Sequence, residues 1–101
     1  MASRLYLQTQ LESILGNRNV YFQPPESVKM NYPAIVYALE DVDNVHADDG
    51  VYLSHKRYSI TLIDKNPDSQ FVDSVAKLPT CKFNRYYPSD NLNHWNFSLY
   101  F

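Results

Sequence analysis

Two segments of the chain carry apolar residues at the spacing of one face of an α-helix. The first covers residues 3–15 and ends before Gly16, a residue type that readily takes the left-handed conformation found after helices. The second begins at the Asn-Pro-Asp sequence of 66–68, where a capping side chain, a proline and an acid favour a helix start, and it ends before Pro79. Each helix should bury its apolar face against a core.

The other apolar segments alternate, or run unbroken over short lengths, as β-strands do. They predict strands at residues 20–23, 34–39, 51–64, 80–87 and 93–101. The run 34–39 is apolar on both alternating faces, so we expect it to be the central strand. The acidic stretch 41–50 is expected to be a mobile, solvated hairpin loop, and residues 88–92 a loop too long for a two-residue turn.

The order of these elements, α-β-β-β-α-β-β, predicts a single α+β domain over residues 1–101. Its sheet should be antiparallel or mixed, with two helices packed on one face. The helix stripe and the strand faces that must meet predict one core, which includes Ile60, Leu62, Phe71, Val75, Trp95 and Phe97.

Composition indicates which kinds of partner and which cellular compartment suit this domain. The formal net charge of −2 gives no general attraction to nucleic acid or to an anionic membrane. Cys81 is the only cysteine, which excludes an intrachain disulfide and agrees with folding in a reducing compartment. No segment approaches the ~20 apolar residues of a membrane span. Nine tyrosines favour surfaces that become interfaces with other proteins.

No established catalytic, cofactor-binding or metal-binding pattern is found in the sequence. None of the three histidines has a second histidine three or four residues away, as a helical metal pair would. The acidic stretch 41–50 departs from a calcium loop, because Val45 and His46 stand where an oxygen ligand and a glycine belong. No serine lies in a nucleophile elbow, and two isolated glycines cannot form a phosphate loop. We therefore expect a binding protein that is not an enzyme and needs no cofactor.

A nucleic-acid-binding module is one alternative. The segment 82–87 interleaves Lys82 and Arg85 with Phe83, Tyr86 and Tyr87, as a stacking platform for single strands would. The glycine-containing aromatic signature of the common RNA-binding sheet is absent. A strand whose alternate rings enter a core or a subunit interface explains the same residues.

Four short phrases, in the order in which they follow the leading helix, resemble a known family. They are YPAIVY at 32–37, YSITLID at 58–64, LPTCKF at 78–83 and DNLNH at 90–94, followed by a closing aromatic strand. Together they are similar to small tail-completion proteins of long-tailed bacteriophages, especially the tail terminators of phages that infect Gram-positive bacteria. The resemblance covers nearly the whole chain in element order and length.

The resemblance implies a structural virion protein without catalytic residues. Such a protein forms a ring, usually a hexamer, at the head-proximal end of the tail tube and joins the tube to the neck. Its partners would be other copies of itself, the tail tube protein and a neck or head-completion protein, with DNA only passing through the lumen and no membrane involved. It would act in the virion after assembly in the host cytoplasm. Another head-tail connector, such as a head-closure or adaptor protein, is the alternative in the same setting.

Three features nominate residues for the interface or the lumen. They are the acidic stretch, the basic and aromatic strand, and the end of the last strand, which lacks a charged residue and would need cover if it were a sheet edge. The candidates are Asp41, Asp43, Asp48, Asp49, Arg85, Tyr86, Tyr87, Tyr100 and Phe101.

Overall fold

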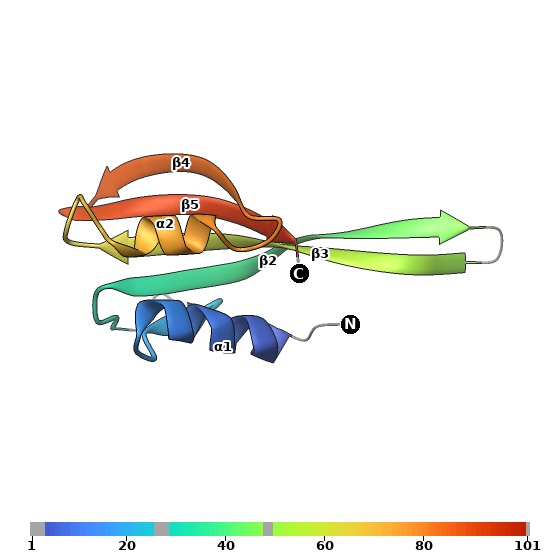
Figure 1. The fold of residues 1–101 in the computed structure, drawn as a ribbon, viewed down its shortest axis with the longest axis horizontal. Coiled ribbons are helices and arrows are strands. Elements are labelled where there is room, and N and C mark those ends of the chain that lie inside the picture. Colours follow the sequence, from blue (N-terminus) through green and yellow to red (C-terminus); the bar gives the residue numbers. More distant parts are fainter. Residues whose placement is uncertain (1–3, 26–28, 48–49, 101) are drawn as a thin grey trace.

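The protein has an α+β fold in which two helices pack against a five-stranded mixed sheet, in the predicted element order (Figure 1). The computed structural model describes residues 4–25, 29–47 and 50–100, with the backbone alone over 43–47 and 50–55. In chain order the elements are α1 (Arg4–Leu15), β1 (Val20–Phe22), β2 (Ala34–Ala47), β3 (Gly50–Asp64), α2 (Phe71–Ala76), β4 (Lys82–Ser89) and β5 (Leu92–Tyr100).

The strands lie in the order β1-β2-β3-β5-β4, so the middle strand is β3 and not the predicted run 34–39. That run begins β2, which pairs with the three-residue strand β1 in parallel and with β3 in antiparallel fashion. The prediction was wrong because an unbroken apolar run does not report how many strands lie beyond it, nor does it require cover on both faces. Ile35 and Tyr37 are fully buried under the helices, whereas Val36 and Ala38 on the other face are only partly buried.

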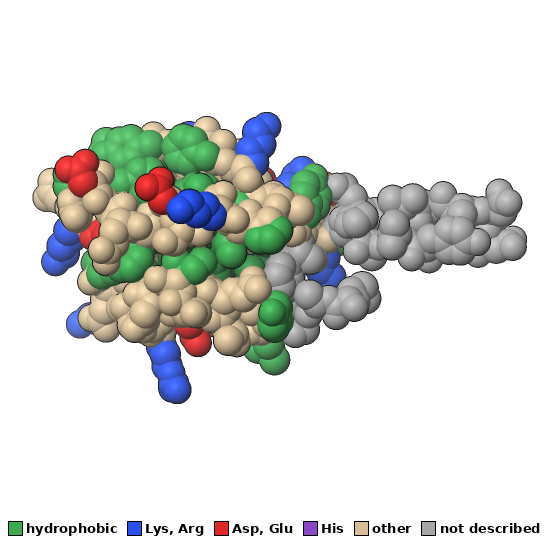
Figure 2. All heavy atoms as spheres, viewed as in Figure 1, with side chains coloured by type: hydrophobic (Ala, Val, Ile, Leu, Met, Phe, Trp, Pro, Cys, Tyr) green, Lys and Arg blue, Asp and Glu red, His purple; other side chains and the backbone are tan. Residues whose placement is uncertain are grey.

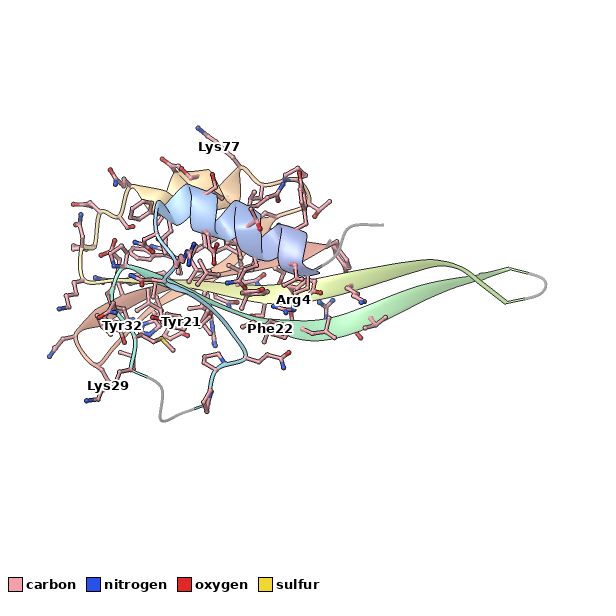
Figure 3. All side chains as sticks on the ribbon, turned by 90° about the horizontal axis from the view of Figure 1, so that it is seen from below. Arg4, Tyr21, Phe22, Lys29, Tyr32 and Lys77 are labelled. Atoms are coloured by element: carbon pink, nitrogen blue, oxygen red, sulfur yellow. The ribbon has the colours of Figure 1, made fainter. Side chains whose placement is uncertain are left out.

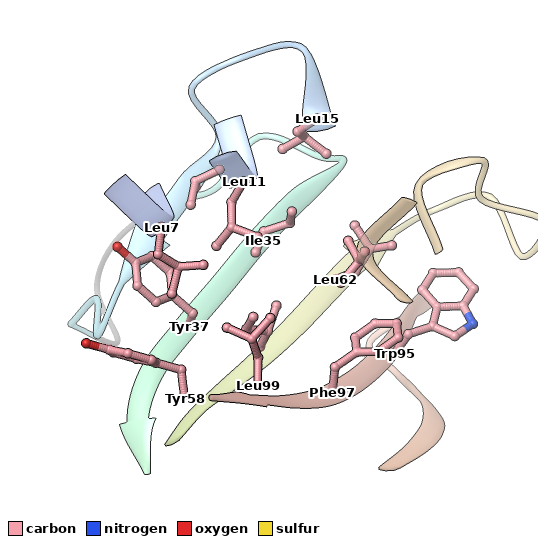
Figure 4. Close-up of a cluster of buried hydrophobic side chains, with 13 residues drawn as sticks. Leu7, Leu11, Leu15, Ile35, Tyr37, Tyr58, Leu62, Trp95, Phe97 and Leu99 are labelled. Atoms are coloured by element: carbon pink, nitrogen blue, oxygen red, sulfur yellow. The ribbon is translucent and has the colours of Figure 1, made fainter. Parts of the chain in front are cut away.

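Both helices lie over one face of the sheet, as expected (Figure 3). The stripe Leu7, Leu11 and Leu15 of α1 is buried against that face, and Val75 does the same from α2. The predicted core is confirmed, with Phe71 partly buried at its margin. The buried cluster (Figure 4) consists of Leu7, Leu11, Leu15, Val20, Ile35, Tyr37, Tyr58, Ile60, Leu62, Val75, Trp95, Phe97 and Leu99.

A polar contact inside this cluster fastens α1 to the sheet. Arg4 Nη1 donates a hydrogen bond to the Tyr37 hydroxyl at 3.0 Å, and that hydroxyl donates to Gln8 Oε1. The Arg4 guanidinium also lies 4.3 Å from the centre of the Phe22 ring on β1. The only polar atom of the buried Tyr37 side chain is thereby paired, which removes the penalty for burying it.

The acidic stretch 41–50 is not the loop that the sequence predicted. Residues 41–47 continue β2 and pair with residues 50–57 of β3, from Asp41 opposite Arg57 to Ala47 opposite Gly50. The prediction relied on a composition typical of loops, but aspartate is uncommon in strands without being excluded from them. Antiparallel pairing with β3 supplies the backbone hydrogen bonds of these residues. The paired segments 41–47 and 50–56 are called the arm below. Asp48 and Asp49 lie outside the described residues.

Two further boundaries differ from expectation for local reasons. Asp90 and Asn91 form a two-residue turn between the paired Ser89 and Leu92, and both turn residues have positive φ, 52° and 62°. Aspartate and asparagine tolerate this conformation better than most residues do. Before α2, the side chain of Asn66 accepts from the backbone of Asp68 at 3.0 Å and makes a turn, so the helix starts only at Phe71.

Candidate interaction surfaces

Strand β4 forms one edge of the sheet and is exposed along almost its whole length. Its pairing with β5 shifts register between Phe83 and Arg85, so Asn84 is the extra residue of a bulge. A bulge, a lysine such as Lys82 and a proline such as Pro88 are devices that limit unwanted backbone pairing at sheet edges. β4 therefore offers its side chains, more than its backbone, to a partner.

The face of the sheet opposite the helices, which we call the open face, carries a polar network. Asn96 Nδ2 donates to Ser59 Oγ at 3.0 Å and to Thr61 Oγ1 at 3.1 Å. From the bulge, Asn84 Nδ2 donates to Asn96 Oδ1 at 3.1 Å and to Ser98 Oγ at 2.7 Å. These amides and hydroxyls hold one another in place, so the open face presents a fixed polar surface across β3, β5 and β4.

A hollow of about 550 Å³ lies where the open face meets the base of the arm. Arg57 Nε lies 3.4 Å from Glu40 Oε2, and Arg57 Nη2 lies 3.6 Å from Asp41 Oδ2. A hydrogen bond with Tyr100, assisted by these two carboxylates, raises the pKa of Arg57 above its ordinary value. The hollow is lined by Glu40, Arg57, Thr80, Lys82, Asn84, Ser98 and Tyr100. The base of the arm is thus held by charge pairs, and the far side of the hollow carries Lys82.

A stacked column stands on the open face beside this hollow. The ring of Tyr87 is stacked on that of His94, with centroids 4.8 Å apart and planes inclined by 11°. The guanidinium of Arg85 lies 5.0 Å from the centre of the Tyr87 ring. The register places Arg85 opposite Asn96, so its charge is displayed on the same face as the polar network. Flat rings and a cation that are already stacked offer a preformed surface to a partner.

The other face of β4 carries two exposed aromatic side chains, Phe83 and Tyr86. Phe83 packs edge-on against Phe97, and Tyr86 lies tilted against Trp95, with ring centroids 5.5 and 5.6 Å apart. Phe83 nevertheless remains 49% exposed and Tyr86 46% exposed. Figure 2 shows apolar side chains gathered at this edge of the body, over β4. The core therefore continues to the surface at the edge of the sheet.

The arm projects from the sheet as a two-stranded ribbon (Figure 1). β1 pairs with β2 at residues 35–37 and β5 pairs with β3 at residues 57–64, so within the described part of the chain each strand of the arm pairs only with the other. The ribbon makes the molecule 51 Å long, against 25 and 23 Å in the other two directions. A two-stranded ribbon is marginally stable by itself in water, so the arm is the least supported part of the sheet among the described residues.

The structure divides the residues nominated from the sequence among three places. Asp41 lies at the base of the arm beside Arg57, and Tyr100 lines the hollow. Arg85 and Tyr87 lie together on the open face, whereas Tyr86 points to the helix side. Asp48, Asp49 and Phe101 lie outside the described residues, and for Asp43 only the backbone is described. The basic and aromatic strand is therefore not one continuous stacking platform.

The last strand is not an edge of the sheet. β5 lies between β3 and β4, and Leu99 is 1% exposed. The backbone at Tyr100 is tied to the preceding segment, because the Thr80 hydroxyl donates to Tyr100 O at 2.6 Å and accepts from Tyr100 N at 3.1 Å. Of the two ways in which this strand could be covered, by its own sheet or by a neighbouring chain, the structure shows the first as far as Leu99, while Tyr100 remains 38% exposed.

Sequence reasoning missed the hollow, because its lining depends on register. Glu40 and Arg57 meet only if the hairpin continues past Leu39, where the sequence was interpreted as a loop. The alternation along residues 51–64 puts Arg57 and Thr61 on the side opposite Ile60 and Leu62, and the structure has them there, away from the core. The missing signal was the pairing partner, which a single strand pattern does not contain.

Within the described part of the chain, no group of three or more His, Cys, Asp or Glu side chains is placed to hold a metal ion. Burial raises the pKa of the Cys81 thiol above its ordinary value, so this half-buried cysteine is mostly protonated at neutral pH.

No helix among the described residues is long and apolar enough to cross a membrane. Comparison with protein-family models, with curated proteins and with solved structures finds no match.

Proposed function

We propose that the protein is a tail terminator of a long-tailed bacteriophage, a structural subunit that caps the head-proximal end of the tail tube as a ring. The observation that carries this proposal is the arm. It is a ribbon about as long as the rest of the molecule is wide, and it has no cover from its own chain among the described residues. Such an element gains stability when it lies on another subunit.

The surfaces around β4 support the same proposal. A subunit of a ring needs two different contact surfaces, because head-to-tail contacts close into rings. The arm is one such surface, and the β4 edge with its open-face and aromatic sides is another. The resemblance of the four short sequence phrases to tail-completion proteins selects the setting, namely a ring of usually six copies between the tail tube and the neck.

The partners follow from that position. The ring would contact the tail tube protein on one side and a neck or head-completion protein on the other, and DNA would pass through its lumen without being read. A head-closure or adaptor protein of the same neck is the second candidate, supported by the same surfaces. A nucleic-acid-binding module is less favoured, since Arg85 and Tyr87 lie on one side of β4 and Tyr86 on the other.

The test is to mix the purified protein with tubes assembled from the cognate tail tube protein and to image the tube ends. Rings at one end of most tubes, together with arrested tube growth, are the expected result. Bare ends over a wide range of protein concentration, with the protein folded by circular dichroism, would refute the terminator proposal. Binding to the head portal in place of the tube would favour the adaptor. Salt-sensitive binding to single-stranded DNA would favour the nucleic-acid module.

A further inference from the structure

We infer that the arm of one subunit docks on the open face of the next subunit, with its acidic strand against Lys82 and Arg85 of β4. This inference rests on the proposed ring and names the two surfaces that form it. The occupant is a second copy of this chain, because the arm points away from its own body (Figure 1). Three observations carry the inference, and they concern charge, size and geometry.

The charges of the two surfaces are opposite. The arm with its turn, residues 41–56, contains four aspartates and one lysine, whereas residues 82–89 contain Lys82 and Arg85 and no carboxylate. Both cations are exposed, and the register places Lys82 opposite Ser98 and Arg85 opposite Asn96, on the open face. Glu40, which lines the hollow with Lys82, is paired with Arg57. Among the described residues, no carboxylate forms an ion pair with Lys82 or Arg85, so the open face at β4 presents a positive charge that an acidic ribbon complements.

The dimensions of the two surfaces agree. Each strand of the arm has about seven residues, which at roughly 3.3 Å per residue extends about 23 Å. The whole molecule measures 25 and 23 Å in its two shorter directions. An arm of this length crosses a neighbouring sheet from one side to the other. It would reach the hollow of about 550 Å³ that Lys82 and Asn84 line.

The geometry makes this contact head-to-tail. The arm and the β4 side of the open face are different surfaces of one chain, so every subunit can dock its arm on one neighbour and bind the arm of another neighbour on its open face. Contacts of this kind propagate from subunit to subunit and end only when a ring closes. The polar network of Asn84, Asn96 and Ser98 is held in place before docking, which lowers the entropy lost on association.

Two variants test the arm and the open face that would bind it separately. In the first, residues 43–55 are replaced by Asn-Gly, which closes the paired Val42 and Lys56 with a two-residue turn and removes the arm. In the second, Lys82→Glu and Arg85→Glu reverse the charge of the receiving face. The control carries Lys65→Glu and Lys77→Glu, two exposed lysines outside β4 and the arm, with the same change of net charge. Figure 3 shows Lys77 on the helix side of the sheet.

The measurement is sedimentation velocity with native mass spectrometry, at low salt and at several protein concentrations. We expect the wild type and the control to associate, and each variant to associate at least about 10-fold more weakly. An equimolar mixture of the two variants should form a one-to-one heterodimer that grows no further, because one intact arm and one intact face remain. Added salt should weaken every complex.

Several results would overturn the inference. They are a wild type that stays monomeric up to about 1 mM, variants that associate like the wild type, and a mixture that stays monomeric. Loss of single-stranded DNA binding in the Lys82→Glu, Arg85→Glu variant, with unchanged assembly, would assign the basic face to nucleic acid. The tube-end assay separates the two proposals. If both variants cap tube ends, arm docking is refuted and the terminator proposal stands. If the two variants form a heterodimer but the wild type leaves the tube ends bare, docking stands and the terminator proposal is refuted.

Discussion

The body and the arm are parts of one hairpin that are stabilised in different ways. In the body, β2 and β3 have neighbouring strands and lie under two helices, and residues such as Tyr37 and Ile60 have no exposed surface. In the arm, the same two strands pair only with each other among the described residues. Backbone pairing alone therefore does not distinguish the core of the fold from a projecting ribbon. Pairing with a third strand does, and no described strand pairs with the arm.

The largest effect should come from a core aromatic residue compared with its exposed neighbour. Phe97 is fully buried and Phe83, which packs on it, is 49% exposed. Phe97→Ala should lower the free energy of unfolding by about 3–5 kcal/mol, and Phe83→Ala by about 1 kcal/mol. Chemical denaturation monitored by circular dichroism measures both. Equal losses would contradict the register in which β4 lies outside the core.

Hydrogen exchange should separate the two parts of the hairpin residue by residue. Amides of 60–62 in β3 are covered on both sides by paired strands, whereas those of 51–56 have a single paired neighbour. The free energy of the local opening that allows exchange should be lower for the arm amides than for amides 60–62 by about 2 kcal/mol or more, because opening the arm exposes little of the core. Exchange resolved by NMR provides the values. Equal protection in a monomer would mean that the arm is part of the cooperative core.

A smaller effect is expected at the polar contact that ties α1 to the sheet. Tyr37→Phe removes the hydroxyl that accepts from Arg4 and donates to Gln8, and should cost about 1–2 kcal/mol of stability. Tyr86→Phe is the matched control, since that exposed hydroxyl bonds only to Asn93 among the described residues and should cost less than about 0.5 kcal/mol. A Tyr37→Phe variant as stable as the control would contradict this role.

The same tyrosine predicts a dependence on pH. Burial, opposed by the hydrogen bond from Arg4, raises the pKa of Tyr37 above its ordinary 10.0. The folded state then keeps the proton that the unfolded state loses, so this contribution to stability is complete below pH 10 and falls as the pH rises from 10 toward the folded pKa. The difference in stability between wild type and Tyr37→Phe should shrink over that range. A constant difference from pH 8 to 11 would refute the shift.

The smallest effect should come from removing the arm. Among the described residues the backbone of this segment pairs only within the arm, so replacing residues 43–55 by Asn-Gly should change the free energy of unfolding by no more than about 1 kcal/mol. Thermal and chemical unfolding of the monomer measure this change. A loss of several kcal/mol would show that the arm supports the body and would remove the contrast between them.

Much of the fold was accessible from local pattern. The leucine stripe of α1 and the alternation of Trp95 and Phe97 report which side of an element is buried, and both were predicted correctly. Strand pairing was harder to predict, because the apolar pattern of one segment does not show which strand lies beside it. The position of β5 between β3 and β4 and the extension of β2 beyond residue 39 were missed for this reason. The surfaces were found only in part for the same reason. Arg85 and Tyr87 were nominated, but the hollow around Arg57 depends on strands far apart in the sequence.

The position of the arm has a consequence for how quickly the chain folds. The core pair of Ile35 and Leu62 is separated along the chain by residues 36–61, which include the whole arm, so forming this pair closes a long loop. Closing a longer loop costs more entropy, and contacts between distant residues slow folding. The chain without residues 43–55 should therefore fold faster than the full chain at nearly equal stability. The speed lost by the full chain would be a kinetic consequence of carrying the arm.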